Sequence, residues 1–223
     1  MYDPKFDSFF EMPNLEEKWW NDGNFSTIWN LNQQFSNDRK SAVSMWPGSA
    51  VEYNGKKANY IAGYSRNVSL NDRMDKIIEW LTLQNEPANL VLAYFCQLDQ
   101  KIHKFGPISP EAKEKVQELD NSINYLTQKL KEKNLFDETN LIILSDHGSS
   151  EIREERLLNL TRLCDSSDLI ISGNSPNIDI FVKNKLNLDK IYNQLLKASK
   201  QLPFNVYKRE EIPLKYHFNN HRY

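Results

Sequence analysis

The spacing of apolar and polar residues predicts a chain in which strands and helices alternate. Apolar runs at 41–45, 90–96 and 140–144 have the length and aliphatic character of buried strands. Between them, apolar residues recur at three- and four-residue steps over 70–83 and 110–134, which predicts two amphipathic helices. Strand, helix, strand in this order is the arrangement of a βαβ unit. We therefore expect an α/β fold with a mostly parallel sheet flanked by helices.

Both predicted helices carry start signals. Ser69 or Asn71 can cap the first helix. Ser109 and Pro110 supply an N-cap and a first-turn proline at the start of the second. The apolar positions of the second helix form one stripe, made of Val116, Leu119, Ile123, Leu126 and Leu130. This stripe predicts that one face of the helix is apolar.

The last third of the chain predicts smaller elements. The segment 173–176, Gly-Asn-Ser-Pro, separates two apolar runs and predicts the turn of a hairpin. The predicted elements are a short helix at 157–163, hairpin strands at 169–171 and 178–182, a helix at 188–201 and a terminal strand at 204–207. No repeat or low-complexity tract interrupts the 223 residues, so we expect one domain over 1–223.

Composition narrows the class of partner. A chain with 39% hydrophobic, 12% aromatic and 26% charged residues is typical of an ordered globular protein. The net charge is −2 and no basic stripe is present, so we expect no nucleic-acid polymer as a partner. No run approaches the roughly 20 apolar residues of a membrane span, and residues 1–5 do not resemble a signal peptide. We expect no membrane contact from this segment.

Two sequence features bear on the cellular compartment. The two cysteines, Cys96 and Cys164, allow at most one disulfide and leave the compartment open. Sequons of the N-x-S/T type occur at Asn24, Asn67 and Asn159 and are candidate glycosylation sites. They favour a secreted context only weakly, because such triplets also arise by chance in an Asn-rich chain.

Pairs of a carboxylate and an imidazole follow two of the predicted strands. Asp99 and His103 come after the second strand, and Asp146 and His147 come directly after the third. Zinc accepts both kinds of ligand, and open α/β sheets place their chemistry at the carboxyl ends of strands. Two such pairs at two strand ends indicate a two-metal site. Each pair alone is also compatible with a surface histidine beside a solvated aspartate.

Several segments resemble one enzyme family. Residues 94–107 resemble the metal-binding stretch of the ectonucleotide pyrophosphatase/phosphodiesterases, and Ser-Asp-His-Gly at 145–148 resembles that family's second metal motif. Further matches are Met-Tyr-Asp-Pro at 1–4, Trp-Pro-Gly-Ser at 46–49 and Ile-Pro-x-x-x-His-Phe-Asn-Asn at 212–220. Together these segments span nearly the whole chain. The segment 155–176 is most similar to short members that carry only the catalytic domain, among them a diadenosine triphosphate hydrolase.

This resemblance implies an alkaline-phosphatase-like α/β fold and two zinc ions. Asp99 and His103 would bind one zinc ion, and Asp146 and His147 the other. The resemblance also implies hydrolysis of a phosphodiester or pyrophosphate bond in a nucleotide or dinucleotide polyphosphate, through a covalent intermediate on a hydroxyl nucleophile. An extracellular or cell-surface location is implied as well.

Two aromatic residues are candidate substrate contacts by the same resemblance. Tyr94 occupies the position of an aromatic residue that stacks on the substrate base, and Trp46 lines the same pocket. A tyrosine at the end of a buried strand is also a common core residue, so a structural role for Tyr94 stays open.

The resemblance further implies that the domain is incomplete at both ends. The family's nucleophilic threonine and first aspartate ligand precede the segment matched by 1–4, and its last histidine ligand follows the segment matched by 217–220. Each pair in this chain would supply two ligands, whereas catalytic zinc sites have three protein ligands and a water. We therefore expect the isolated chain to bind zinc weakly and to hydrolyse nothing.

Local departures from the family pattern leave alternatives open. Ser149 stands where the family usually has methionine, and Ala50 stands where an acidic residue is common. The first hypothesis is a piece of a zinc-dependent extracellular phosphodiesterase. The second is a non-catalytic extracellular binding module that keeps the fold. A sulfatase or phosphomutase of the same superfamily is disfavoured by the Trp-Pro-Gly-Ser element.

Overall fold

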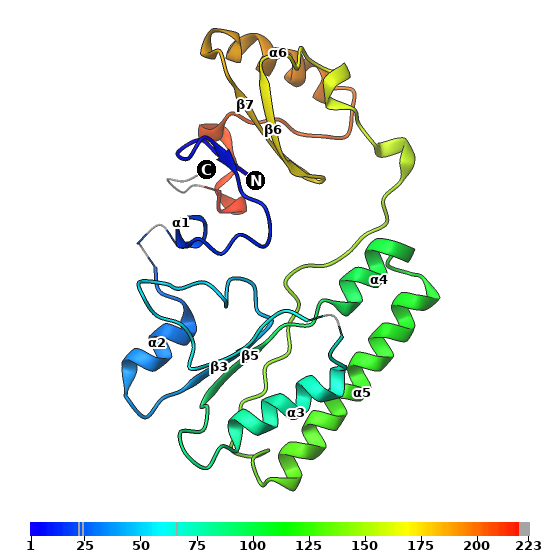
Figure 1. Cartoon of the computed structure of the whole chain (residues 1–223). Helices are drawn as coiled ribbons and strands as arrows, with labels where there is room; N and C mark the ends of the chain where they lie inside the picture. Colours follow the sequence, from blue (N-terminus) through cyan, green and yellow to red (C-terminus); the bar gives the residue numbers. More distant parts are fainter. Residues whose placement is uncertain (22, 24, 66, 219–223) are drawn as a thin grey trace. The chain divides into compact units, whose positions relative to one another are not determined.

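The computed structural model describes residues 1–21, 23, 25–65 and 67–218. The chain forms two compact units, one spanning Leu15–Glu151 and the other combining Met1–Asn14 with Ile152–Tyr223 (Figure 1). Among the described residues, no helix combines the length and the apolar character needed to cross a membrane.

The larger unit is built on a parallel sheet of three strands. Their order is β4 (Tyr60–Ala62), β3 (Ser41–Ser44) and β5 (Leu90–Ala93), so β3 pairs in parallel with a neighbour on each side. Every residue of β3 is buried, as expected for the central strand of a sheet covered on both faces. The predicted α/β fold with a parallel sheet is confirmed.

Helices cover both faces of this sheet (Figure 1). Because side chains alternate across a strand, Val43 packs with Trp29 on one face, and Ala42 packs with Trp80 on the other. Trp29 belongs to the helix on the first face and Trp80 to a helix on the second. The helices of this unit are α1 (Glu17–Trp20), α2 (Ile28–Phe35), α3 (Leu70–Leu81), α4 (Gln97–Phe105) and α5 (Pro110–Glu132).

The two long predicted helices form as expected. The Ser69 hydroxyl accepts the backbone N–H of Asp72 at 3.1 Å, and the Ser109 hydroxyl accepts that of Ala112 at 3.2 Å. Ser69, not Asn71, is therefore the cap of α3. The apolar stripes of α3 and α5 face each other and form one buried cluster: Met74, Ile77, Ile78, Leu126 and Leu130.

Two predictions around the sheet are corrected by the structure. The second predicted strand, 90–96, ends at Ala93, and α4 starts at Gln97. The third predicted strand, 140–144, does not form: the segment is irregular, and Ile142 and Leu144 are 78% and 73% exposed. An aliphatic run becomes a strand only when a neighbouring strand takes up its backbone hydrogen bonds, and no described strand pairs with this one.

In its described residues, the smaller unit contains two antiparallel hairpins and one long helix. The predicted hairpin and the helix after it are confirmed, and a two-residue hairpin near the start was not predicted. The elements are β1 (Tyr2–Asp3), β2 (Ser8–Phe9), β6 (Leu169–Asn174), β7 (Asn177–Val182) and α6 (Leu188–Ser199). Its apolar cluster is made of Cys164, Leu169, Ile191 and Leu195.

Other predictions for this unit are wrong. The predicted helix 157–163 is reduced to a 3-10 turn, η2 (Leu160–Arg162), because the Asn159 side chain accepts the Thr161 N–H and holds a turn. The predicted strand 204–207 is irregular, since no described strand pairs with it. The remaining short turns are η1 (Glu154–Arg156), η3 (Lys185–Asn187), η4 (Arg209–Glu211) and η5 (Leu214–Tyr216).

Candidate functional site

Helix α4 presents the first carboxylate–imidazole pair. Asp99 and His103 are four residues apart, so they share one face of the helix. The distance between His103 Nε2 and Asp99 Oδ1 is 3.3 Å, and their side chains are 78% and 38% exposed, respectively. Both side chains are accessible from solvent, and their two ligand atoms are close enough to contact one ion.

Helix α4 begins directly after β5 and ends at a glycine. The Tyr94 N–H donates to the carbonyl of Ser44 at 3.0 Å, which continues the ladder between β5 and β3 for one residue beyond the strand. Cys96 is the N-cap of α4. Gly106 ends the helix with φ of 91° and donates its N–H to the Ile102 carbonyl at 2.8 Å. The helix therefore starts directly beyond the carboxyl end of β5.

The second pair lies on a tight irregular segment. His147 Nε2 is 3.8 Å from Asp146 Oδ2, and both side chains are about 60% exposed, at 61% and 59%. His147 Nδ1 lies 2.9 Å from the Gly148 carbonyl, and the Ser145 hydroxyl donates to the His147 carbonyl at 2.6 Å. The pKa of His147 is raised above its ordinary value. The main cause is the hydrogen bond to the Gly148 carbonyl, and the second is the charge of the Asp146 carboxylate.

Tyr94 contacts the second pair, and the carboxylate of the first pair acts on it electrostatically. Its hydroxyl donates to Asp146 Oδ2 at 3.5 Å, the outer limit for such a bond. Burial, followed by the carboxylates of Asp146 and Asp99, raises the pKa of the Tyr94 hydroxyl. Asp99 also contributes to the raised pKa of His147. The carboxylates of both pairs therefore act on the same hydroxyl, one residue beyond the carboxyl end of β5.

Trp46 lies beyond the carboxyl end of the neighbouring strand. Since β3 and β5 are parallel, the segments that follow them leave the sheet at the same edge. Trp46 is half-buried and packs against the cluster around Trp29 and Tyr53. Gly48 follows with φ of 76°, and a Cβ there would collide with the Tyr53 hydroxyl. The loop after β3 therefore packs tightly against this cluster.

A comparison with protein families identifies the chain. The family model "Type I phosphodiesterase / nucleotide pyrophosphatase" matches residues 1–223. The chain belongs to this family. The predicted family resemblance is therefore confirmed over the full length of the sequence.

Individual members of the phosphodiesterase family are similar at about one third identity. The human ectonucleotide pyrophosphatase/phosphodiesterase family member 5 is 34% identical over 98% of this chain and 45% of its own length. The human bis(5'-adenosyl)-triphosphatase ENPP4 is 33% identical over 99% of this chain and 48% of its own length. The chain thus spans about half the length of these relatives.

A solved relative shares the fold. The murine family member 5, in an inactive threonine-to-alanine variant bound to AMP, superposes with a TM-score of 0.87 at 33% identity. The match covers 98% of this chain and 57% of the solved chain. Human family member 5 superposes with the same TM-score. These structures support the α/β assignment of the phosphodiesterase-family chain.

The side chains of the two pairs are of the types that bind zinc, but each pair provides too few ligands for a catalytic zinc site. The two aspartates and two histidines provide oxygen and nitrogen ligands of the types that zinc binds. Over the residues that the structure describes, no group of three or more His, Cys, Asp or Glu side chains is placed to hold a metal. Each pair therefore offers two ligands, one fewer than the protein contributes in a catalytic zinc site.

The structure describes the asparagines of two of the three sequons. Asn67 and Asn159 are exposed, as glycan attachment requires. The Asn159 Oδ1 accepts hydrogen bonds from the Thr161 N–H at 3.1 Å and from its hydroxyl at 2.7 Å. Asn24 lies outside the described residues.

The structure also contains a buried arginine near Phe95 that the sequence analysis does not predict. Arg73 is only 3% exposed, and its Nη2 donates to the Ser65 carbonyl at 2.7 Å. Burial lowers the pKa of its guanidinium, which also lies 5.9 Å from the ring of Phe95. The available signal was its position directly before Met74 and four residues before Ile77, on the apolar stripe of α3.

Proposed function

We propose that this chain carries part of the active site of a zinc-dependent nucleotide pyrophosphatase/phosphodiesterase, as one partial domain over 1–223. The observation that supports this most strongly is the Tyr94 hydroxyl. It contacts Asp146 at 3.5 Å, and its pKa is raised first by burial and then by the charges of Asp146 and Asp99. The two metal ions of such a hydrolase lie about 3.5–4 Å apart, so their ligand pairs must lie close together.

The spacing within each pair is compatible with a shared cation. Two ligands of a tetrahedral zinc ion, each at about 2.1 Å from it, lie roughly 3.4 Å apart. The donor atoms of Asp99 and His103 are 3.3 Å apart, and those of Asp146 and His147 are 3.8 Å apart. We therefore propose that Asp99 and His103 hold one zinc ion and that Asp146 and His147 hold the other.

One contact of the His147 ring supports this role. A carbonyl oxygen can only accept, so the 2.9 Å contact with Gly148 requires the proton of the neutral ring on Nδ1. The lone pair of Nε2 is then free to face Asp146 Oδ2 and a cation between them. A backbone carbonyl that fixes the tautomer in this way is a common partner of metal-binding histidines.

The chemistry proposed for the complete site is hydrolysis of a phosphodiester or pyrophosphate bond of a nucleotide or dinucleotide polyphosphate. The zinc ions would supply Lewis acidity, which lowers the pKa of a hydroxyl nucleophile and stabilises charge on the transferred group. Tyr94 would stack on the base, with Trp46 beside it on the same sheet edge. We also propose an extracellular setting, with Asn24, Asn67 and Asn159 as glycan acceptors.

Zinc titration and turnover of a chromogenic nucleotide phosphodiester test this proposal. With two ligands for each ion, the 223-residue chain should bind zinc weakly and show no turnover. A longer natural chain that supplies the remaining ligands should bind two zinc ions and lose activity in the His147→Ala variant. Robust turnover by the 223-residue chain, abolished by His147→Ala, would contradict the ligand count.

The shortage of ligands favours one second candidate. A chain with two pairs and no described group of three donors could act as a non-catalytic binding module that keeps the fold. Two equivalents of tightly bound zinc in the longer chain, with turnover, would exclude this alternative. AMP binding that persists after removal of zinc, with no turnover in either chain, would support it.

A further inference from the structure

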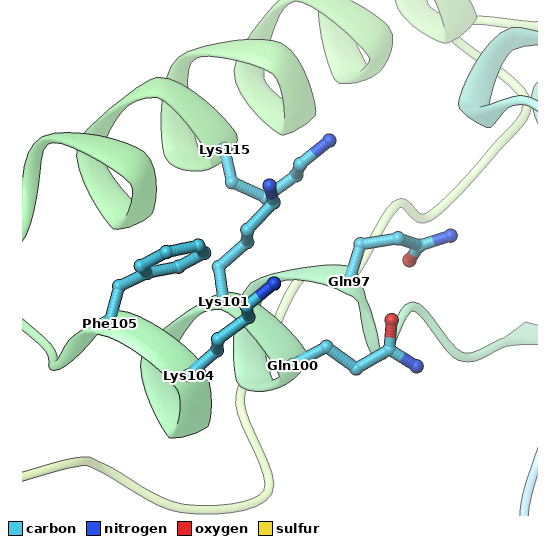
Figure 2. A pocket seen from close by; sticks show the side chains of 6 residues that line it. All are labelled: Gln97, Gln100, Lys101, Lys104, Phe105 and Lys115. Carbon is cyan, nitrogen blue, oxygen red and sulfur yellow. The ribbon is translucent and has the colours of Figure 1, made fainter.

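A pocket of about 290 Å³ lies between α4 and α5, and six residues line it: Gln97, Gln100, Lys101, Lys104, Phe105 and Lys115. Five come from α4 and one from α5. Figure 2 shows the Phe105 ring on one side of the pocket and the carboxamides of Gln97 and Gln100 on the other. The lining therefore combines ammonium and carboxamide groups and contains no acidic side chain.

The pocket is separate from the candidate zinc ligands. Gln97, Gln100, Lys101 and Lys104 are spaced by three and four residues and share one face of α4. At 100° per residue, Asp99 and His103 fall on the opposite face of the same helix. A ligand in the pocket would therefore contact the back of the helix that carries the first pair.

The two α4 lysines lack a compensating charge. Neither Lys101 nor Lys104 forms an ion pair with a described carboxylate, whereas Lys115 is paired with Glu118. The Nζ atoms of Lys101 and Lys104 lie 5.5 Å and 5.0 Å from the centre of the Phe105 ring. Two like charges gathered on one ring repel each other, and an anion between them would remove that repulsion.

A polar group of the lining is also left without a partner. The side-chain oxygen of Gln97 is buried and has no hydrogen bond within the described residues. No hydrogen bond therefore holds this oxygen in place, and the Nε2 end of the carboxamide is a donor available to a bound oxyanion. Gln100, by contrast, donates to the Tyr64 hydroxyl at 3.3 Å and to Cys96 Sγ at 3.5 Å.

We propose that this pocket binds a small multivalent phosphate anion. Lys101 and Lys104 supply the charge, Gln97 a further N–H donor, and Phe105 the wall that holds the two ammonium groups together. Phosphate oxygens accept several hydrogen bonds at once, which matches a lining made of donors. The site is independent of zinc and of the proposed hydrolytic chemistry.

Calorimetric titration with inorganic pyrophosphate tests the site. The full 223-residue chain is used in low salt with EDTA, so that metal ions do not contribute. We expect saturable one-to-one binding, weakened about tenfold in the Lys101→Gln/Lys104→Gln variant. The matched control, Lys113→Gln/Lys133→Gln, removes two exposed lysines outside the lining and should change the affinity by less than about twofold.

Two further arms keep the test decisive. The Lys101→Arg/Lys104→Arg variant retains both charges and should bind pyrophosphate nearly as well as the parent chain. Inorganic sulfate carries less charge and should bind more weakly than pyrophosphate. The proposal is overturned by an absence of saturable binding at about millimolar pyrophosphate, by equal losses in the pocket and control variants, or by sulfate binding as tightly as pyrophosphate.

Discussion

The two aliphatic runs that precede the Asp–His pairs have opposite fates. Leu90–Ala93 becomes β5, pairs with β3 and is half-buried. Residues 141–144 are at least as aliphatic, yet they form no strand, and Ile142 is 78% exposed. The difference teaches that an apolar run predicts burial only where a second strand is available to pair with it. The site nevertheless receives one pair from each run.

The largest expected contrast is in stability. Leu130 is 1% exposed in the cluster beneath β5, so Leu130→Ala should lower the free energy of unfolding by about 2–5 kcal/mol. Leu144 is 73% exposed, and Leu144→Ala should change it by less than about 0.5 kcal/mol. Urea denaturation measures both. Similar losses in the two variants would show that the second run is buried after all.

Hydrogen exchange compares the backbones of the two runs directly. The amides of β5 that bond to β3 should exchange on the order of a hundredfold more slowly than those of residues 142–144, because only the former are held in a ladder. Mass spectrometry of peptides covering each run provides the measurement. Comparable protection in both would mean that the second run has a pairing partner in solution.

A smaller effect is expected at the start of the helix that connects the runs. Ser109→Ala removes the hydroxyl that accepts the Ala112 N–H and should cost about 1 kcal/mol. Ser149, which is exposed beyond the second run, provides the matched control, and Ser149→Ala should be nearly neutral. Thermal and urea unfolding measure the stability of both variants. Equal stability of the two would show that the Ser109 cap does not stabilise the helix.

The smallest effect is expected where the two regions meet. Tyr94→Phe removes a hydroxyl whose bond to Asp146 is 3.5 Å long, so the free energy of unfolding should change by less than about 0.5 kcal/mol. The NMR signals of residues 145–148 should nevertheless shift. A loss of more than about 1 kcal/mol would favour a structural role for Tyr94.

Local signals account for the part of the fold that the sequence could predict. The Ser69 and Ser109 caps and the apolar stripes of α3 and α5 act within a few residues, so both helices form as predicted. The three-residue strand β4 was missed because it is too short to show a period. Helix α4 was partly hidden by the apolar run through Phe95. The strands that could pair with residues 140–144 lie far away in the chain. The local sequence therefore gives no sign that this segment does not form a strand.

The site shows the same limit. The sequence pairs Asp99 with His103 because both follow the second apolar run, but their place on one face of a helix is visible only once α4 is described. The link from Asp146 to Tyr94 joins residues 52 positions apart and depends on the path of the irregular segment. The raised pKa values of Tyr94 and His147, each with a contribution from Asp99, could be found only from the three-dimensional arrangement.

Cobalt titration followed by NMR tests the central claim that both pairs share one site. Co²⁺ accepts the same ligands as zinc and shifts the signals of nuclei around it. In the Asp146→Ala/His147→Ala variant, only the Asp99–His103 pair remains to bind the ion. We predict that the bound ion still shifts the Gly148 amide, as it shifts the amides of α4. An ion that shifts α4 and leaves residues 145–148 unchanged would contradict the account.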